Sequence, residues 1–340
     1  MHVLVTGGAG FIGSHASLRL LDDGHQVTVV DNLFRGHQAA VDILANVGGS
    51  RCRFIRADLG DTNALTAALR GVDAVMHFAA LTYVGESVEK PLDYWRGNLA
   101  GTLSLLEAMS AAQVTRMVLS STCATYGEPP PERVPIDETC PQMPVNPYGR
   151  SKLACERIIL DHAEAQRRAG RAFGFAFLRY FNVCGVDPAG RIGEDHRPET
   201  HLIPICLDVA LGTRDALTIF GEDWSTPDGT CVRDYVHVAD LVDAHVLVSS
   251  RLGDDTELIY NVGTGTGHSV RAVLDSCRRV TGLPIPAKTG SRRAGDPPAL
   301  VNSPGKIRSE LGWQARRASL DVMVEDAWRW RRAHPRGYAI

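Results

Sequence analysis

The chain has 340 residues, of which 44% are apolar, and its formal net charge is -3. That length allows one large core or one core with a smaller lobe, and the charge gives no indication of a nucleic-acid partner. No stretch approaches the ~20 apolar residues of a membrane span. The first expected strand starts at residue 2, which leaves no room for a secretion signal. We therefore expect a cytoplasmic protein that binds neither nucleic acid nor membrane.

The strand expected over 2–6 runs directly into a glycine-rich turn followed by a helix over 11–23. Glycine allows backbone angles that other residues avoid, and it leaves room for a ligand phosphate against the main chain. The amides of the helix's first turn, with the helix dipole, would face that phosphate. The spacing is G-x-x-G-x-x-G instead of G-x-G-x-x-G, and an ordinary tight turn is the alternative. A bound dinucleotide is expected to contact Gly7, Gly10, Phe11, Ile12 and Gly13.

Acidic residues follow the next two expected strands, over 26–30 and 52–56. Asp31 lies ~20 residues beyond the glycine turn, where an acid holds the ribose of the adenosine. It favours NAD, since it would repel the extra phosphate of NADP. Asp58, with Leu59 beside it, is placed to reach the adenine, although Asp58 could instead cap the following helix.

The fourth expected strand, over 73–78, ends in Phe78-Ala79-Ala80. The small residues in this segment would let a cofactor pass close over the strand. We therefore include all three in the predicted cofactor site. His77 is expected to be a packed strand residue and not a ligand.

The fifth expected strand, over 116–120, delivers the hydroxyls of Ser120, Ser121 and Thr122 to the carboxyl edge of the sheet. Ligands bind at this edge in parallel sheets. One hydroxyl can therefore hydrogen-bond the reacting oxygen of a substrate. The alternative is that these side chains only cap backbone at the end of the strand.

A helix over 148–168 begins after Asn146, a good N-cap, and Pro147, a good first helical residue. Tyr148 and Lys152 are four residues apart and share one face of it. A free tyrosine titrates near ~10, but an ammonium, a helix N-terminus and a positive nicotinamide ring would each favour the phenolate. Tyr148 could then remove a proton from a sugar hydroxyl. A surface Tyr/Lys pair is the alternative.

Alternating strands and helices over 1–180 predict an α/β fold, a Rossmann-type doubly wound parallel sheet that binds NAD. The other elements expected there are helices over 37–47, 61–70 and 98–112 and a strand over 173–179. Residues 181–340 are expected mainly to form a smaller C-terminal α/β substrate lobe, with some segments returning to the first domain. Its expected helices cover 201–211, 238–252, 268–281, 304–311 and 319–334, and its strands 217–220, 235–237 and 258–262.

Eight cysteines are spread singly along the chain, and none forms a C-x-x-C pair. A zinc ribbon is therefore unsupported, and we expect no metal. Reduced, mostly buried thiols are the expected state.

The chain resembles the extended short-chain dehydrogenase/reductases over nearly its whole length, and among them the UDP-glucose 4-epimerase (UDP-galactose 4-epimerase) family. The glycine turn and Tyr148 to Lys152 mark the superfamily. The segments that point to sugar-nucleotide epimerases are Val84-Gly85-Glu86-Ser87-Val88, Arg179-Tyr180-Phe181-Asn182, Val232-Arg233-Asp234-Tyr235-Val236-His237-Val238 and Tyr260-Asn261-Val262-Gly263.

The resemblance implies a role for each matching residue. Tyr148 would be the base, Lys152 its electrostatic partner and Thr122 the hydroxyl on the sugar oxygen. The implied NAD contacts include Asp31, Asn32, Asp58, Asn98 and Tyr180. The implied UDP contacts are Asn182, His201, Leu202, Phe220, Arg233, Arg293 and Asp296. Guanidinium groups suit a diphosphate, although ordinary surface arginines are the alternative.

Three positions depart from the pattern of some family members. Thr82 stands where some members have a lysine for the cofactor, which weakens one phosphate contact. His201 replaces an asparagine near the UDP. Leu300 stands where certain members carry a large tyrosine and others a small residue, so sugar selectivity stays open.

The reaction that the resemblance implies is interconversion of UDP-glucose and UDP-galactose, with hydride removed and returned at sugar carbon 4. The alternatives are 4-epimerases of UDP-N-acetylglucosamine, a UDP-pentose or UDP-glucuronate, and a regulator that binds NAD without catalysis. A 4,6-dehydratase is disfavoured, because Cys123 and Ala124 follow Thr122 where an acid pair is needed. Apolar stripes such as Leu99, Leu103, Leu106 and Met109 suggest a homodimer, with packing against the sheet as the alternative.

Overall fold

The computed structural model describes residues 1–293 and 296–338, and the chain divides into two compact units. Unit 1 comprises Met1–Gly127, Gln142–Arg179 and Val242–Tyr260. Unit 2 comprises Glu128–Pro141, Tyr180–Leu241 and Asn261–Ile340. Each unit contains its own cluster of buried apolar side chains.

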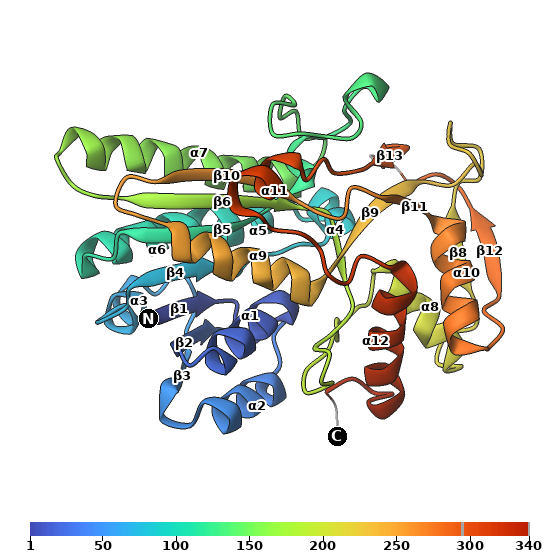
Figure 1. Ribbon diagram of the computed structural model, residues 1–340, viewed down its shortest axis with the longest axis horizontal. Helices are drawn as coiled ribbons and strands as arrows, with labels where there is room; N and C mark the ends of the chain where they lie inside the picture. Colours follow the sequence, from blue (N-terminus) through green and yellow to red (C-terminus); the bar gives the residue numbers. More distant parts are fainter. Residues whose placement is uncertain (294–295, 339–340) are drawn as a thin grey trace. The chain divides into compact units, whose positions relative to one another are not determined.

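A seven-stranded sheet with the order β10-β6-β5-β4-β1-β2-β3 forms the centre of unit 1 (Figure 1). The pairs from β5 to β3 are parallel. The strand order reverses between β1 and β4, which confirms the doubly wound α/β fold. The strands are β1 (His2–Thr6), β2 (Gln26–Asp31), β3 (Cys52–Arg56), β4 (Ala74–His77), β5 (Arg116–Thr122), β6 (Gly174–Tyr180) and β10 (Glu257–Val262).

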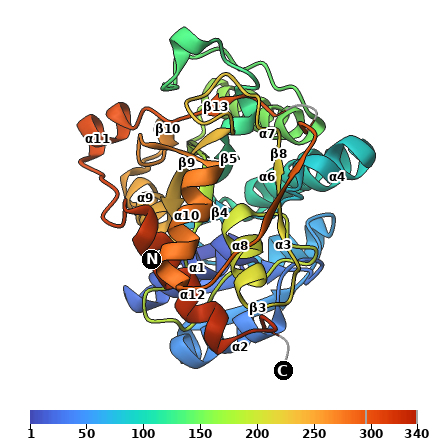
Figure 2. The same cartoon turned by 90° about the vertical axis from the view of Figure 1, so that its right-hand side faces the viewer.

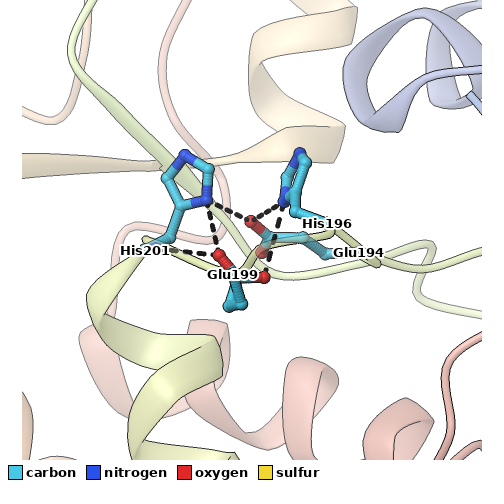
Figure 3. A group of neighbouring side chains, drawn as sticks. All are labelled: Glu194, His196, Glu199 and His201. Carbon is cyan, nitrogen blue, oxygen red and sulfur yellow. Dashed lines mark hydrogen bonds and ion pairs between the residues drawn. The ribbon is translucent and has the colours of Figure 1, made fainter. Parts of the chain in front are cut away.

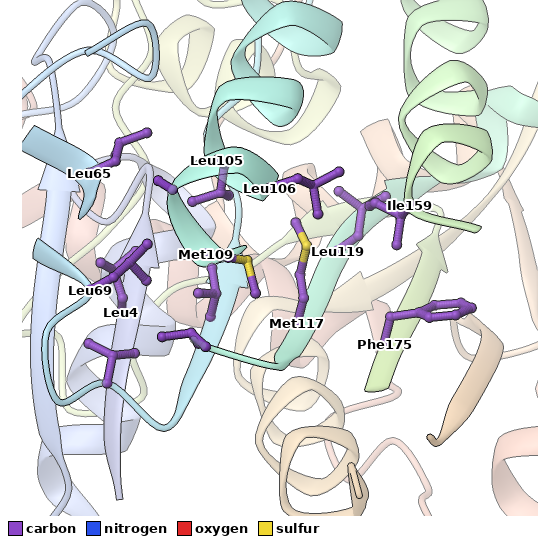
Figure 4. Close-up of a cluster of buried hydrophobic side chains, with 14 of the residues drawn as sticks. Leu4, Leu65, Leu69, Leu105, Leu106, Met109, Met117, Leu119, Ile159 and Phe175 are labelled. Atoms are coloured by element: carbon purple, nitrogen blue, oxygen red, sulfur yellow. The ribbon is translucent and has the colours of Figure 1, made fainter. Parts of the chain in front are cut away.

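Side chains of these strands alternate between two covered faces, as buried parallel strands require. Leu4, Val30 and Val75 join a core that also contains residues of α3, α6 and α7 (Figure 4). The intervening Val3, Val5 and Val29 are also buried, so the opposite face is covered too. The helices are α1 (Phe11–Asp22), α2 (Gln38–Gly48), α3 (Thr62–Ala68), α4 (Val84–Glu89), α5 (Pro91–Tyr94), α6 (Gly101–Ala112), α7 (Pro147–Arg168) and α9 (Val238–Arg251), with 3-10 turns at Gly49–Arg51 and Cys123–Thr125 and a π-helix at Trp95–Ala100.

Unit 2 combines two small sheets with a helical cluster. One sheet has the order β11-β9-β13 with β7 paired to β9, and the other is the pair β12-β8. Helices α8, α10 and α12 contact one another (Figure 2) and bury Ile203, Leu274 and Met323. The elements are β7 (Asn182–Cys184), β8 (Leu217–Phe220), β9 (Val232–His237), β11 (Gly267–Ser269), β12 (Ala287–Gly290), β13 (Ala299–Leu300), α8 (Leu202–Ala210), α10 (Val270–Thr281), α11 (Gly305–Leu311), α12 (Leu320–Ala333) and a 3-10 turn at Pro131–Arg133.

The expected elements are present, with ends shifted by a few residues, and six short ones were not expected: α4, α5, β7, β11, β12 and β13. The helix expected over 98–112 begins as the π-helix at Trp95 and continues as α6. Its apolar stripe packs mainly on the sheet: Leu106 and Met109 are buried in the core and Leu99 packs against it. Leu103 is 44% exposed.

All eight cysteines are free thiols, seven of them buried and Cys52 half-buried. Burial raises the pKa of the Cys52, Cys140 and Cys155 thiols. Among the described helices, none is long and apolar enough to cross a membrane.

Candidate active site

Tyr148 lies in the first turn of α7, where the sequence sets the helix start. The Asn146 side chain accepts a hydrogen bond from Gly149 N at 2.9 Å, and Pro147 occupies the first helical position. A Cβ on Gly149 would lie 2.4 Å from Ala124 O, so this turn packs directly on the segment that follows β5. Tyr148 is 7% exposed, and its ring meets the Tyr94 ring edge-on with centroids 6.4 Å apart.

Lys152 is buried one turn further along α7. Its Nζ donates to Ser120 O at 2.8 Å, which ties the helix to the end of β5. Burial lowers the pKa of the Lys152 ammonium, although the negative potential of Cys155 and Glu156 opposes this. The Lys152 Nζ therefore lies at the carboxyl end of the sheet, beside the end of β5.

Thr122 ends β5 and is buried. Its Oγ1 accepts a hydrogen bond from Ala124 N at 3.1 Å, so the hydroxyl does cap the following 3-10 turn. The hydroxyl proton is not used in that bond. Thr122 can therefore cap the turn and still donate to a substrate oxygen.

A buried ion pair that the sequence analysis missed lies behind these residues. Glu156 of α7 pairs with Arg179 of β6, with Arg179 Nη2 2.6 Å from Glu156 Oε2. Ser121 Oγ donates to Glu156 Oε1 at 2.6 Å, and Gln142 Nε2 donates to Oε2 at 2.9 Å. The network fixes α7 against β5 and β6. Removal of either Glu156 or Arg179 would leave the other as an unpaired buried charge.

The glycine turn after β1 has the tight backbone that its sequence predicts. Gly7 has a φ of +69°, and its N donates to Val30 O at 2.8 Å. A Cβ on Gly7 would lie 2.6 Å from Ala79 N, and one on Gly13 would lie 2.2 Å from Gly7 O. Gly10 is the N-cap residue of α1 and offers no side-chain cap. The turn therefore exposes main-chain atoms and not side chains. Phe11 and Ile12 are the first two residues of the helix that follows it.

Asp31 closes the same turn from the end of β2. Its Oδ2 accepts from Ala9 N at 3.0 Å and its Oδ1 from Leu33 N at 2.8 Å. Burial raises the pKa of Asp31 in spite of these bonds. Asn32 Nδ2 donates to Asp58 Oδ2 at 2.8 Å, so the predicted adenosine contacts are brought together.

The N-cap of α3 is Asp61, whose side chain accepts from Ala64 N at 2.9 Å. Asp58 therefore does not cap this helix, which removes the alternative interpretation of that residue. Leu59 packs against the core of unit 1, where a Cβ on Gly101 would lie 2.9 Å from Leu59 Cδ1.

His77 and Asn98 are buried and hold segments around the site. His77 Nδ1 lies 2.7 Å from Thr6 Oγ1, and Nε2 lies 3.0 Å from Thr102 Oγ1. Burial, with the charge of Lys152, lowers the pKa of His77 to about 3. His77 is thus a packed strand residue, as expected.

Asn98 links the loop after β4 to α7. Its Oδ1 accepts from Leu81 N at 2.7 Å, and its Nδ2 donates to Leu81 O and Ser151 Oγ, each at 3.0 Å. The neighbouring Phe78 packs its ring 4.8 Å from the His245 ring, and Ala79 and Ala80 continue the loop over Gly7.

Arg35 is a further candidate that the sequence analysis did not single out. Its Nη2 donates to both Glu86 oxygens at 2.9 and 2.8 Å, and its guanidinium lies 4.2 Å from the centroid of the Tyr83 ring. Its Nη1 is buried and makes no hydrogen bond within the described residues. The adjoining Gly36 and His37 contact Ala9 of the glycine turn. In the sequence Arg35 is a single arginine a few residues after Asp31. It indicates no function until the fold shows its partners Glu86 and Tyr83.

Unit 2 gathers four of the predicted UDP contacts that are far apart in the sequence. Asp296 Oδ1 lies 3.8 Å from Arg233 Nη2, and its Oδ2 lies 3.4 Å from Arg293 Nε. The Arg293 guanidinium lies 4.8 Å from the centroid of the Phe220 ring, which is exposed. Leu300 is the β13 partner of Arg233. The result is a surface with two guanidinium groups and one aromatic face.

The remaining predicted residues lie on three other elements. Tyr180 ends β6 and Asn182 begins β7. Leu202 begins α8, and His201 is its N-cap residue, with Nδ1 2.8 Å from Glu199 Oε1. Burial alone would lower the pKa of the neighbouring His196, but Glu194 and Glu199 outweigh it and raise this pKa to about 10.

A doubly wound sheet with a glycine turn after β1, and a Tyr/Lys pair on α7 tied to the end of β5, defines a Rossmann-type dinucleotide-binding protein. The chain matches the NAD dependent epimerase/dehydratase family over residues 3–263. That match covers most of the chain, and the chain therefore belongs to this family.

Similar proteins support the same assignment. The chain is 47% identical over 342 residues to a UDP-glucose 4-epimerase of Halalkalibacterium halodurans, covering 100% of this chain and 98% of that one. It is 48% identical over 347 residues to UDP-arabinose 4-epimerase 1 of Arabidopsis thaliana, covering 100% and 81%. A crystal structure of UDP-glucose 4-epimerase from Bifidobacterium longum in complex with NAD+ and UDP aligns with a TM-score of 0.93, 37% identity and coverage of 99% and 100%.

Proposed function

We propose that the chain is an NAD-dependent isomerase that interconverts UDP-glucose and UDP-galactose by inverting sugar carbon 4. The observation that carries this proposal is the arrangement in unit 1 of a buried tyrosine, a buried lysine and a strand-end threonine. Tyr148 and Lys152 share the first turns of α7, and that turn packs on the segment after Thr122. The full-length similarity to named 4-epimerases supports the choice of reaction.

The residues present fit NAD. Gly7 and Gly13 offer main chain where side chains would collide, and Gly10 leaves the N-cap without a side chain, which suits a diphosphate at the start of α1. Asp31 and the Asn32–Asp58 pair offer oxygens for ribose hydroxyls and the adenine. When bound, the nicotinamide supplies a hydride acceptor and donor for the sugar carbon.

Arg35 extends this cofactor site. Thr82 lacks the positive charge that some family members place there, and Arg35 supplies one beside the glycine turn with a buried, unsatisfied Nη1. An anionic cofactor oxygen would satisfy that group. Arg35→Gln is expected to weaken NAD binding about 10- to 150-fold, the range for a lost charged hydrogen bond. Calorimetry on Arg35→Gln and on the exposed control Arg53→Gln checks this, and equal affinity in the two variants would contradict it.

Tyr148 holds and moves the proton. Its phenolate oxygen takes the proton of the sugar 4-hydroxyl and returns it to the same oxygen once the 4-keto sugar presents its opposite face. Lys152 favours the phenolate through its positive charge. The Thr122 hydroxyl donates to the same sugar oxygen and orients it.

Most of the proposed contacts to the substrate are made to its UDP part. Arg233 and Arg293, bridged by Asp296, suit the diphosphate, and Phe220 offers a face for the uracil. Asn182, His201 and Leu202 complete the proposed UDP contacts. UDP is held firmly while the sugar makes few contacts. The keto sugar can therefore rotate and present its other face between hydride removal and hydride return.

The test is incubation of the purified protein with UDP-galactose, with and without added NAD, followed by chromatography for UDP-glucose. A parallel reaction uses UDP-arabinose, because the plant relatives named as UDP-arabinose 4-epimerases are equally similar. A faster reaction with the pentose would make UDP-arabinose the principal substrate. N-acetylated UDP-hexoses test the space beside Leu300. Binding of NAD without turnover of any UDP-sugar would favour the regulator and overturn the enzyme assignment.

We also propose a homodimer in the cytoplasm with a role in galactose metabolism. Eight free thiols are typical of a reducing compartment. Leu92 of α5 and Leu103 of α6 are 71% and 44% exposed, although both are large apolar side chains. The surface around these two leucines is the proposed dimer contact.

A further inference from the structure

Segment 194–201, which leads into α8, carries two histidines and two glutamates whose side chains converge (Figure 3). One ligand atom from each lies within 4.8 Å of the ligand atoms of the other three. The Glu194 and Glu199 side chains are 5% and 11% exposed. Because two buried carboxylates are poorly solvated, their negative charges need positive charge nearby.

The distances between these atoms match the edges of a tetrahedral metal site. Zn–N and Zn–O bonds of about 2.0–2.2 Å place ligand atoms about 3.3–3.6 Å apart in a tetrahedron. Glu194 Oε1 lies 3.3 Å from His196 Nδ1 and 3.4 Å from His201 Nδ1. His196 Nδ1 lies 3.5 Å from Glu199 Oε2. The fourth contact, His201 Nδ1 to Glu199 Oε1 at 2.8 Å, is a hydrogen bond that a metal would replace.

A second observation points to a ligand at the same place. Glu194 is 7% exposed, and its Oε1 makes ion pairs with His196 Nδ1 and His201 Nδ1 but no closer hydrogen bond within the described residues. A buried carboxylate oxygen in this position costs free energy unless a cation or donor satisfies it. Glu199, in contrast, is oriented by hydrogen bonds from Thr200 N and His201 N, each 2.8 Å long, as metal-binding carboxylates commonly are.

We propose that this segment binds a divalent transition-metal ion, with Zn²⁺ preferred, through the side chains of Glu194, His196, Glu199 and His201. Two imidazoles and two carboxylates suit Zn²⁺ and Co²⁺, whereas Mg²⁺ prefers oxygen ligands and keeps its waters. The two carboxylates neutralise the charge of the ion. The site contains no cysteine, so it has no C-x-x-C signal in the sequence. Its ligands form two E-x-H patterns that begin five residues apart.

The metal would fix the loop against the start of α8, where His201 and Leu202 lie. By fixing the loop, the metal would also hold His201 and Leu202 in place for UDP. That role in UDP binding rests on the proposed function, but the metal site itself does not. Metal binding and epimerase turnover are therefore measured separately, and the failure of one leaves the other standing.

The test uses the full chain, stripped with a chelator and then titrated with ZnCl₂ and CoCl₂ by calorimetry and visible absorption, with metal content measured by mass spectrometry. We expect one Zn²⁺ per chain, intense tetrahedral Co²⁺ bands and no competition from equimolar MgCl₂. His196→Ala should weaken Zn²⁺ binding by at least about 100-fold, since loss of even an outer partner of a ligand costs 10- to 100-fold.

His268→Ala, at a half-buried histidine of β11, is the matched control and should bind Zn²⁺ as the parent does. Glu194→Gln and His201→Asn, with their folding checked by circular dichroism, replace His196→Ala if that variant fails to fold. Absence of Zn²⁺ binding by the parent, or unchanged stoichiometry and affinity in the three cluster variants, overturns the proposal. An octahedral Co²⁺ spectrum would overturn the tetrahedral assignment.

Discussion

Lys152 shows how burial and function combine in one residue. Its side chain is buried, and its ammonium is held by Ser120 O at 2.8 Å. Keeping a charge there costs free energy, which the hydrogen bond to Ser120 O offsets in part. Tyr148, on the same face of α7, is the group that benefits, because a nearby positive charge favours the phenolate.

Replacement of Tyr148 by phenylalanine removes the proton acceptor and leaves the ring against Tyr94. Tyr148→Phe should therefore bind NAD and UDP as the parent does and lose turnover about 100- to 10,000-fold, the range for a lost general base. Steady-state kinetics and calorimetry with UDP separate the two effects. Parent-like turnover would remove Tyr148 from the mechanism.

His77 makes the stability of the protein sensitive to acid. Its pKa is about 3 in the folded state against 6.5 in the unfolded chain, so between these pH values the unfolded state binds more protons. Its contribution is fully present above pH 6.5 and is lost as the pH falls toward about 3. The slope amounts to at most about 1.4 kcal/mol per pH unit.

His77→Gln should flatten the plot of unfolding free energy against pH over this window, whatever its effect on stability at pH 7. Urea denaturation at several pH values measures the slope. His25→Gln, at a histidine outside the core, is the control for loss of a histidine elsewhere. Equal slopes in parent and His77→Gln would show that another group carries the acid sensitivity.

At the scale of elements, local signals determined what the sequence could predict. The glycine turn and α7 were found because Gly7, Asn146 and Pro147 act through their own backbone. The short strands β11, β12 and β13 were missed because two to four residues carry no periodicity, and their pairing depends on partners far along the chain. Arg35, Glu156 and Glu194 were missed for the same reason, since only the fold brings their partners to them.

The glycine turn provides an element-scale prediction. A Cβ on Gly13 would lie 2.2 Å from Gly7 O and 2.8 Å from Gly7 C, both backbone atoms that cannot move without opening the turn. Gly13→Ala should cost about 1–3 kcal/mol of NAD binding, or about 5- to 150-fold in affinity. Gly305→Ala, at a glycine whose added Cβ would meet only Ser303 Oγ at 3.9 Å, is the control. Fluorescence titration with NAD checks both, and tight binding by Gly13→Ala would argue against a phosphate at this turn.

At the scale of the whole molecule, the proposed dimer depends on apolar side chains that the core does not use. Leu92→Glu combined with Leu103→Glu should convert the protein to a monomer, because charges at the proposed contact would have to be desolvated in the dimer. Sedimentation equilibrium at micromolar concentration measures the mass. Leu283→Glu, at another exposed leucine, is the control and should remain dimeric. A monomeric parent protein would end the proposal.

The distribution of thiols gives the molecule an internal reporter. Cys123 and Cys155 are buried in unit 1, whereas Cys140, Cys184, Cys206, Cys231 and Cys277 are buried in unit 2. An alkylating reagent reaches such a thiol only when the surrounding structure opens. The order in which these positions become labelled during gradual denaturation would thus reveal whether the two halves melt together or one after the other, without any added dye or engineered probe.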